Sequence, residues 1–376
     1  MPPPANGPAA PDRFRQVALW ALLAAFVWRS VDFLEVLKVQ PLGVDYAPFR
    51  AGMQALADGR AYDFAFVTQL QGWPMGSDYL RPFLYPPSSF FLFAPLAALP
   101  YWVGYGLLVA GGYALFAWAG RRLGAPWWMA LFPAAGLVAL CGQVTFLLGA
   151  LIAGALSLQK RPYLAGVLFG LAAALKPQLL VLAPVALVGA RQWRTLAAAG
   201  VTVALAVGLS TVLWGLESWV QWLNAMPRFQ NEVVPGSPGQ LDDGITPYSM
   251  LAARGLPGLW ALGLAPVALV LAWTSLRRPD PLDQLVMLVG ATLMVLSYAM
   301  HYEAALLLPA VAAYLARTGD RQWPLYAAVA CFFTVGLVFG FTPVLAALVL
   351  PLSTWLRAKP GLTAYALRAT AKSARS

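Results

Sequence analysis

The stretch "YLAGVLFGLAAALKPQLLVLAPVALVG", residues 163–189, consists of two apolar runs that are interrupted only by Lys176-Pro177-Gln178. Apolar blocks of about 13 to 22 residues recur from Val17 to Trp355, most of them separated by short polar breaks. Hydrophobic residues make up 60% of the 376-residue chain, whereas soluble domains average about 45–50%. Because blocks of this length suit helices in a bilayer, the sequence predicts an all-α, polytopic integral membrane protein. Some blocks are too short to cross about 30 Å of hydrocarbon, which indicates short or broken helices.

The formal net charge of +10 comes largely from basic residues that recur in pairs between the apolar blocks. This pattern favours positive-inside membrane topology over nucleic-acid binding. The pairs are Arg121-Arg122, Lys160-Arg161, Arg191 with Arg194, Arg277-Arg278, Arg317 with Arg321, and Arg357 with Lys359. If these pairs and the N-terminus lie in the cytoplasm, the outward segments are 16–37, 127–141, 163–175, 195–214, 281–299 and 323–340. The inward segments are then 144–158, 178–190, 257–276, 304–316 and 342–356.

The segment between Arg81 outside and Arg121 inside needs an odd number of crossings, yet it holds two apolar blocks, 83–99 and 101–119. Either one block spans only half the membrane, which gives about 12 spans in total, or Arg121 lies outside and a later short pair is misassigned. We predict one transmembrane domain, residues 16–356, between a Pro/Ala-rich tail at 1–15 and a basic tail at 357–376.

Two long outer loops are expected, a first at 38–82 and a second at 215–256. The first contains "APFRAGMQALADG", which suggests an amphipathic helix at the membrane interface that ends at Gly59. The second contains Trp219 and Trp222, which follow Trp214 and suit an interfacial aromatic belt.

Polar residues gather at the outer ends of the predicted helices. They are Asp45 in the first loop, Tyr85 in "YPP", Gln143 in "GQ", Lys176 and Gln178 in "KPQ", and His301, Tyr302 and Glu303 in "HYE". Each alone also suits an ordinary structural role, such as a solvated acid or a helix cap. Because ionisable groups at membrane depth are costly, their collection on one side predicts a single polar cavity at the outer boundary.

The chemistry of this set fits glycosyl transfer from a lipid-phosphate sugar. The phosphate is a good leaving group, so one carboxylate, Asp45, is enough to take the proton of the acceptor hydroxyl. Partial burial should raise the pKa of that carboxyl and make it a better base. Lys176 with His301 would hold the phosphate. Tyr46 could stack on a sugar ring, and Arg50 could face phosphate or a headgroup.

No cofactor is required for this reaction. The single histidine excludes a His-cluster metal site, and two cysteines in apolar segments suggest neither a disulfide framework nor a metal centre. A divalent cation stays open, since carboxylates occur at Asp45, Asp242, Asp243 and Glu303.

Five segments in order resemble glycosyltransferase family 87, the polyprenol-phosphate-mannose-dependent α-mannosyltransferases of the GT-C fold. They are "GVDYAPFRAGMQALADGRAYD" (43–63), "FLYPPSSFFLFAPLAALP" (83–100), "GQVTFLLGAL" (142–151), "LAAALKPQLLVLAPVAL" (171–187) and "SYAMHYEAALLLPA" (297–310). The resemblance runs across roughly residues 16–320.

The resemblance implies a GT-C bundle with an outward cavity, with Asp45 as the base and Lys176, Gln178 and His301 near the donor phosphate. Many relatives carry an acid beside the histidine, a place that Glu303 would fill here. Further substrate contacts are expected from Tyr46, Arg50, Tyr85, Gln143 and Tyr302. The implied partners are a polyprenyl-phosphate sugar, a glycan or glycolipid acceptor and membrane lipid, at the outer face of a bacterial plasma membrane. The family also includes arabinofuranosyltransferases, so it does not specify the sugar.

Two other functions stay open at this point. A transporter or flippase of lipid-linked saccharide predicts charges deep inside several helices, whereas here they gather at the ends. An oligosaccharide ligase or polymerase typically has its largest outer loop late in the chain and relies on arginines there. This chain has one long loop straight after the first helix, and its later loop holds Arg228 and Arg254, which disfavours this function without removing it.

Overall fold

The computed structural model describes residues 16–17, 19–28, 31, 42–72, 80–234, 241, 243–317, 322–338 and 340–357. Within them the regular secondary structure is helical, apart from one isolated β-bridge between Gly244 and Met300. The predicted N-terminal tail, residues 38–41 and 73–79 of the first outer loop, residues 235–240 and Asp242 of the second, and the C-terminal tail beyond Arg357 lie outside the described residues.

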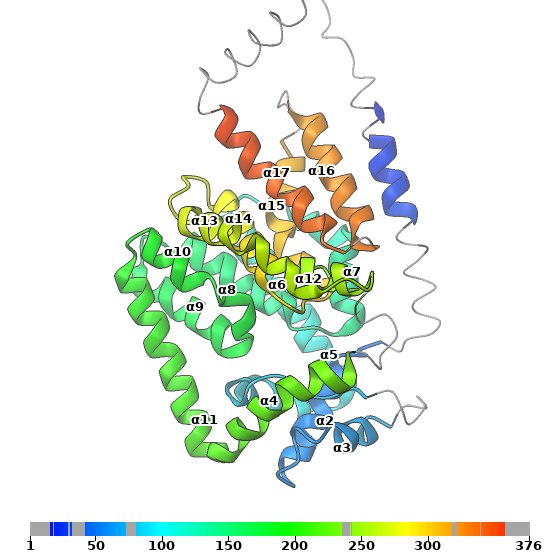
Figure 1. Cartoon of the computed structure of the whole chain (residues 1–376), viewed down its shortest axis with the longest axis vertical. Coiled ribbons are helices and arrows are strands. Elements are labelled where there is room, and N and C mark those ends of the chain that lie inside the picture. Colours follow the sequence, from blue (N-terminus) through cyan, green and yellow to red (C-terminus); the bar gives the residue numbers. More distant parts are fainter. Residues whose placement is uncertain are drawn as a thin grey trace, which may run out of the picture.

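The helices follow the predicted apolar blocks closely (Figure 1). After the helical stretch Leu19–Trp28 come α2 (Tyr46–Leu56), α3 (Phe64–Leu70), η1 (Pro87–Ser89), α4 (Phe90–Ala97), α5 (Tyr101–Gly106), η2 (Leu107–Gly111), α6 (Gly112–Arg122), η3 (Trp127–Leu131), α7 (Pro133–Cys141), α8 (Thr145–Ser157), α9 (Pro162–Leu175), η4 (Pro177–Leu180), α10 (Ala183–Gly189), α11 (Trp193–Arg228), η5 (Phe229–Val233), α12 (Pro247–Ala252), η6 (Gly258–Leu264), α13 (Ala265–Ser275), α14 (Pro281–Val295), η7 (His301–Leu307), α15 (Leu308–Leu315), α16 (Trp323–Val335), η8 (Gly336–Val338) and α17 (Thr342–Arg357).

The main core is a helical bundle. Helix α8 packs against α6 and α9, α9 packs against α11, and α14 packs against α13 and α17. Its interior is filled by Leu, Ala, Val and Phe side chains, so the bundle is held together by close packing of apolar faces.

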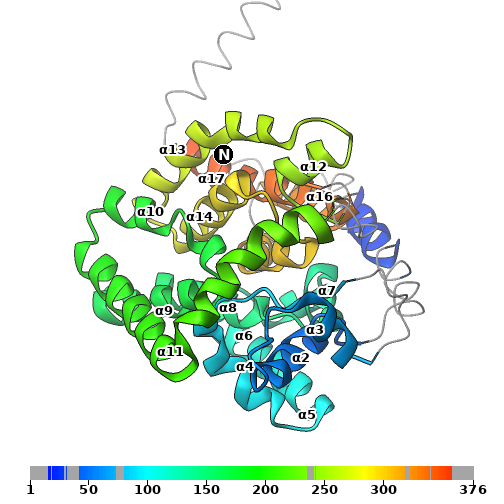
Figure 2. The ribbon, with the colours of Figure 1, turned by 60° about the horizontal axis from the view of Figure 1, so that its bottom comes forward.

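A second, aromatic core lies at one end of the molecule, where α2, α3 and α4 form a layer (Figures 1 and 2). The ring of Phe49 lies 4.5 Å from that of Phe93 and 5.0 Å from that of Tyr85, measured between centroids. The predicted helix that ends before Gly59 is confirmed as α2, and Gly59 has a left-handed φ of +69°. Helix α2 is largely buried in this layer, so its apolar face packs against protein, and its position at a membrane interface stays a prediction.

The predicted second outer loop, residues 215–256, is instead mostly helical up to residue 233. Helix α11 bends sharply at Gly215, whose φ of +80° is open to glycine and strained for other residues. The part after the bend, residues 216–233, turns across the end of the bundle (Figure 2), and we call it the roof helix. Trp222 Nε1 on this helix donates a hydrogen bond to the Leu84 carbonyl at 3.0 Å. The polar residues of this stretch therefore mark a helix that covers the aromatic layer.

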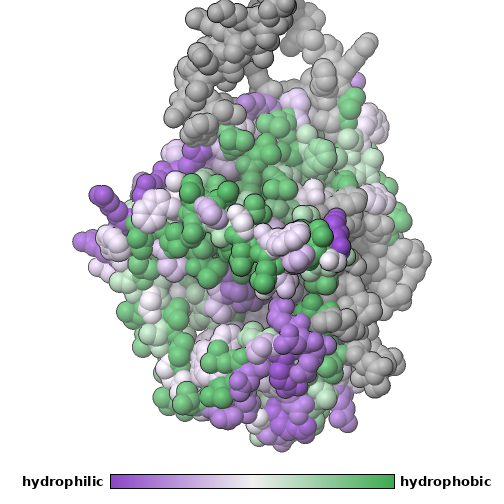
Figure 3. Space-filling model, in the orientation of Figure 1, coloured by the Kyte–Doolittle hydropathy of each residue, from purple (hydrophilic) through white to green (hydrophobic). Residues whose placement is uncertain are grey.

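Three helical stretches among the described residues are long and apolar enough to cross a membrane: Tyr101–Arg122, Trp193–Val233 and Gly258–Ser275. The eight other apolar helices have 10 to 17 residues, as the short blocks predicted. Hydrophobic residues cover much of one face of the molecule, and hydrophilic residues gather at its lower end over α2 and α3 (Figure 3). The chain thus has the features of a membrane protein, and the number of about 12 spans stays a prediction.

The structure bears on the two blocks between Arg81 and Arg121. Residues 101–122 form one continuous apolar helix, whereas Pro87–Ala97 is a helix of only 11 residues, about 16 Å long. The helix of the first block is therefore the shorter of the two, and which alternative holds for the crossings stays a prediction.

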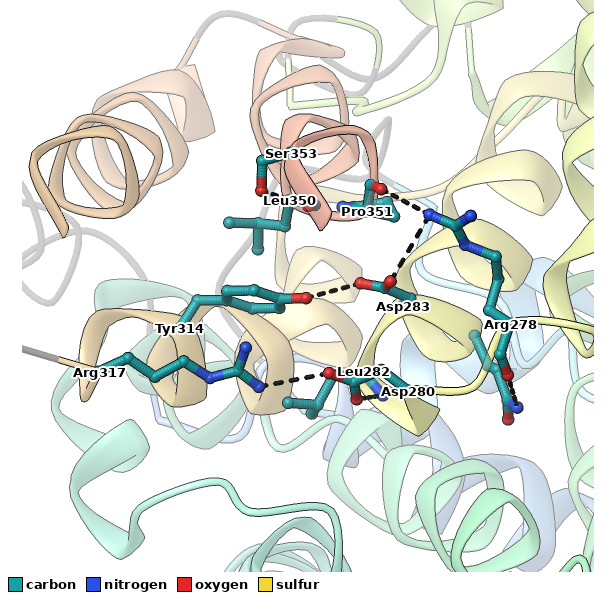
Figure 4. A network of polar contacts seen from close by, with 10 residues as sticks. Arg278, Asp280, Leu282, Asp283, Tyr314, Arg317, Leu350, Pro351 and Ser353 are labelled. Atoms are coloured by element: carbon teal, nitrogen blue, oxygen red, sulfur yellow. Dashed lines mark hydrogen bonds and ion pairs between the residues drawn. The ribbon is translucent and has the colours of Figure 1, made fainter. Parts of the chain in front are cut away.

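A polar cluster ties the helices together far from the aromatic layer (Figure 4). Asp283, 3% exposed, accepts a 2.7 Å hydrogen bond from the Tyr314 hydroxyl and lies 3.7 Å from the Arg278 guanidinium. Arg278 also donates to the Pro351 carbonyl at 2.7 Å, and Arg317 pairs with Asp280 at 3.3 Å. Since each acid has a partner, this cluster joins α14, α15 and α17 without leaving a buried charge unmatched.

We expect Tyr314→Phe to lower the free energy of unfolding by about 1–3 kcal/mol, because one oxygen of the buried Asp283 carboxylate loses its donor. The measurement is denaturant unfolding of the purified protein in detergent. Tyr163→Phe, at a tyrosine that is 62% exposed, is the control and should leave stability unchanged. Equal stability of the two variants would contradict the stabilising role of the cluster.

Candidate functional site

A cavity of about 870 Å³ lies where the bundle meets the aromatic layer. Its walls come from the 44–49 and 80–86 segments, the α7–α8 corner, the Lys176 turn, the roof helix and residues 296–302. The polar residues on the wall include Asp45, Tyr85, Gln143, Lys176, His301 and Tyr302, as the sequence predicted for one common cavity.

Asp45 and Gln143 are held together through the backbone. Helix α7 ends at Cys141, and Gly142 then adopts a left-handed conformation with φ +73° that starts the corner leading to α8. The last turn of a helix has carbonyls without intrahelical partners. Two of these carbonyls accept hydrogen bonds from the first loop, Leu140 O from Gly43 N at 2.7 Å and Cys141 O from Asp45 N at 2.8 Å. The loop acid is thereby fixed next to the corner that carries Gln143.

The Gln143 side chain, which is 4% exposed, is the centre of a hydrogen-bond network. Its Nε2 donates to Asp45 Oδ2 at 2.8 Å and to the Tyr302 hydroxyl at 3.0 Å, and its Oε1 accepts from the Tyr85 hydroxyl at 3.0 Å. Tyr85 is held in turn, because the Tyr62 hydroxyl donates to its carbonyl at 2.7 Å. Side chains from three other segments therefore converge on one amide.

Asp45 is half-buried on the cavity wall. Burial raises the pKa of its carboxyl above the ordinary value, against the opposing effects of the Gln143 hydrogen bond and of the charges of Arg81, His301 and Lys176. Within the described residues, Oδ1 accepts no hydrogen bond, whereas Oδ2 is held by Gln143. The site thus presents a carboxylate with one free oxygen and a pKa raised toward that of a useful base.

Lys176 forms an ion pair with Glu303, which is 2% exposed. The second Glu303 oxygen accepts a 3.0 Å hydrogen bond from the Met300 backbone N–H. The ammonium also lies 5.4 Å from the ring centroid of Tyr85 and 5.8 Å from that of Tyr302. Glu303 does not line the cavity, so its position is behind Lys176 and its predicted contact with substrate is replaced by a contact with Lys176.

His301 and Asp243 lie on adjacent segments joined by the short β-bridge. The His301 backbone N–H donates to the Asp243 carbonyl at 2.9 Å, and the imidazole Nδ1 lies 3.7 Å from Asp243 Oδ1. Both residues line the cavity. A protonated His301 would therefore have an acid beside it.

The remaining predicted residues fall into two groups. Gln178 lines the cavity and is exposed. Tyr46 and Arg50 do not line it. Tyr46 is buried at 1%, donates to the Leu96 carbonyl at 3.1 Å and packs against Tyr101 and Tyr105, so its predicted stacking on a sugar is incompatible with this packing. Arg50 Nε lies 3.5 Å from the Ala97 carbonyl, which directs it away from the cavity.

Sequence reasoning missed several cavity residues. Arg81 served there only to assign topology, yet it lines the cavity and donates to the Val44 carbonyl at 3.1 Å, next to Asp45. Asp243 was considered there only as a carboxylate that could bind a divalent cation. Trp222, Phe229 and Gln230 on the roof helix also line the cavity. Arg81 lies four residues before Tyr85 of the "YPP" motif, and that proximity was the available signal.

The described residues contain no group of three or more His, Cys, Asp or Glu side chains that could hold a metal ion. Asp242, one of the acids considered for a divalent cation, lies outside them.

We expect Gly142→Ala to destabilise the protein by more than the about 1–2 kcal/mol that a left-handed conformation costs an L-residue. The added Cβ would lie 2.8 Å from Tyr46 Cβ, so packing below the corner must also give way. Gly59→Ala is the control, since Gly59 has φ +69° but no atom within 4 Å of the position that a Cβ would take. Unfolding free energies of the two variants give the comparison, and an equal loss would contradict a crowding contribution at the corner.

The model of glycosyltransferase family 87 matches residues 83–299, which is more than half of the chain. Neither a curated protein sequence nor a solved structure was found to match.

Proposed function

We propose a donor, a base and a direction of attack for this chain, which belongs to glycosyltransferase family 87. As a member of that family it is a glycosyltransferase. Our proposal is that it moves a sugar, mannose, from a polyprenyl-phosphate donor to a glycan or glycolipid acceptor. An arabinofuranosyl group would be transferred by the same mechanism.

The observation that carries the proposal is the Asp45 carboxylate on the cavity wall, which has a free oxygen and lies among cations, whereas the other wall carboxylate, Asp243, lies beside His301. Asp45 offers a free Oδ1, and the charges of Arg81, His301 and Lys176 act on it. A base beside cations suits a reaction in which a neutral hydroxyl is deprotonated while negative charge moves onto a phosphate.

In the proposed reaction, Asp45 Oδ1 takes the proton of the acceptor hydroxyl as the acceptor oxygen attacks the anomeric carbon. The bond from that carbon to the phosphate oxygen breaks on the opposite face, and polyprenyl phosphate leaves with the bonding electrons. The anomeric centre is thereby inverted. No second carboxyl is needed as an acid, because the phosphate leaves without a proton, and no cofactor is needed for the same reason.

The donor phosphate is assigned to Lys176, with His301 and Gln178 beside it. Lys176 has three N–H donors, and one is engaged by Glu303. The ammonium therefore keeps donors for phosphate oxygens while the buried carboxylate holds it in place. Apolar wall residues such as Leu84, Leu137 and Leu296 suit an isoprenoid chain next to this end.

The proposed setting is a GT-C-type bundle of about 12 crossings in a bacterial plasma membrane, with the cavity on the extracytoplasmic side. The basic pairs between the helices support that orientation. Membership in a glycosyltransferase family favours bond formation over the transport of a lipid-linked saccharide.

We expect Asp45→Asn to lower transfer from labelled polyprenyl-phosphate mannose in membranes by about 10²–10⁴-fold, the usual contribution of a general base. Because the pKa of Asp45 is raised by burial, wild-type transfer should fall as the pH drops through that raised value and the carboxylate becomes protonated. Asp58→Asn, at an exposed acid just after α2, is the control and should transfer normally. Transfer at the wild-type rate by a normally expressed Asp45→Asn variant would contradict the assignment of Asp45 as the base.

A second experiment separates the structural role of Lys176 from its role at the phosphate. Lys176→Met should cost about 3–5 kcal/mol of stability, because the Glu303 carboxylate stays buried without its cation. The double variant Lys176→Met with Glu303→Gln removes both charges and should regain most of that stability in detergent unfolding.

Transfer by the double variant should stay low, since the phosphate has lost its cation. Wild-type transfer by a stable double variant would show that Lys176 serves the fold alone. A double variant as unstable as Lys176→Met would contradict the pairing itself.

A further inference from the structure

The Gln143 amide has a fixed orientation, which follows from its neighbours. An ionised Asp45 can only accept hydrogen bonds, so the amide nitrogen must face it. Oε1 can only accept, so the Tyr85 hydroxyl must be the donor in that bond. Both hydrogens of Nε2 are then used, one for Asp45 Oδ2 and the other for the Tyr302 oxygen.

This arrangement leaves Gln143 little to offer a ligand. Its nitrogen has no hydrogen left, and the side chain is 4% exposed. Tyr302, in contrast, accepts from Gln143 and donates no hydrogen bond within the described residues, so its hydroxyl hydrogen is available on the cavity wall. The substrate contact that the sequence predicted for Gln143 is thus better supplied by Tyr302.

We propose that Gln143 is the positioning residue of the base: it holds Asp45 Oδ2 so that Oδ1 points into the cavity, and it favours the ionised carboxylate at the pH of the reaction. This inference rests on the proposed function for the reaction itself, but the hydrogen bonds that carry it do not depend on the identity of donor or acceptor.

The backbone of both residues supports this role. Asp45 N is bonded to Cys141 O, and Gln143 N donates to Val138 O at 3.0 Å, so the two side chains start from one rigid corner. A hydrogen bond to the charged form of an acid lowers its pKa and offsets part of the burial cost. Gln143 is the hydrogen-bond donor that acts on Asp45 in this way.

Other groups also face Asp45 and must stay unchanged in a test. The charged and titratable ones are Arg81, Lys176, His301, Tyr85, Tyr101, Tyr302, Cys141 and Asp243. None of them is altered by Gln143→Leu, which removes the amide and nearly keeps the side-chain size.

The test is an infrared pH titration of the full-length protein in lipid nanodiscs. The carbonyl stretch of protonated Asp45 is identified as the band that is absent from Asp45→Asn. We expect the midpoint of this band to rise by about 1 to 2 pH units in Gln143→Leu, the effect of losing one hydrogen bond to a charged group. Gln69→Leu, at an exposed glutamine on α3, is the matched control and should keep the wild-type midpoint.

The pH profile of transfer gives a second readout. In Gln143→Leu the acid limb should move to higher pH by the same amount, and transfer should recover in part at alkaline pH. A merely structural role would lower transfer at every pH and leave the limb in place. A midpoint equal to that of Gln69→Leu overturns the inference.

Tyr85→Phe keeps Gln143 but frees its Oε1, so it is the variant of choice if Gln143→Leu does not fold. In Tyr85→Phe the midpoint of the Asp45 band should rise by less than in Gln143→Leu. A folded Tyr85→Phe variant whose midpoint equals that of the wild type then overturns the inference. If the midpoint rises while Asp45→Asn transfers normally, the positioning role stands and the proposed base fails. The two ideas therefore fail separately.

Discussion

The site depends on the backbone hydrogen bonds between the first loop and the last turn of α7. Gly43 and Asp45 donate to the Leu140 and Cys141 carbonyls, which a helix end would otherwise leave without partners. These bonds satisfy the end of α7 and place the proposed base, with its free oxygen, beside the Gln143 corner. The aromatic layer adds to this restraint, since Tyr46 fills the space under Gly142 and Tyr85 bonds to Gln143.

The basic residues of the cavity are accompanied by acids, unlike those of a phosphate site built of cations alone. Lys176 is matched by Glu303, and His301 lies beside Asp243. A buried pair of this kind gives orientation more than net attraction, because desolvation offsets much of the Coulomb energy. In the proposed reaction, this balance limits how firmly the polyprenyl phosphate product is retained, so turnover need not be held back by product release.

The order and type of the helices could be predicted well from the sequence, because apolar blocks and basic pairs are local signals. The blocks at 163–175 and 281–299 correspond to α9 and α14, and the block at 83–99 contains the short helix Pro87–Ala97. The family resemblance that those motifs carried agrees with the match over residues 83–299. The residues of one polar cavity were also predictable, since they stand at helix ends on one side.

The predictions that failed concern features that are determined by contacts between distant segments. A loop was predicted from Gly215 on, because Glu217, Asn224 and Arg228 are polar. These residues instead lie on the roof helix, which covers the cavity. Tyr46 follows the candidate base directly, but on a helix the next residue points elsewhere, and here it meets Tyr101 and Tyr105. The Lys176–Glu303 pair joins positions 127 residues apart, which no spacing rule detects.

Those sequence separations also bear on how the protein is made. Gln143 joins Asp45 over 98 residues and Tyr302 over 159. During synthesis the loop that carries the base emerges long before residues 298–303 exist, so the early helices enter the membrane with their end of the cavity unfinished. Domains this large assemble through intermediates, and long-range contacts form late. Completion of the proposed site is therefore tied to insertion of the last third of the chain, and a stalled or truncated polypeptide would carry the proposed base without Tyr302 and the residues around it.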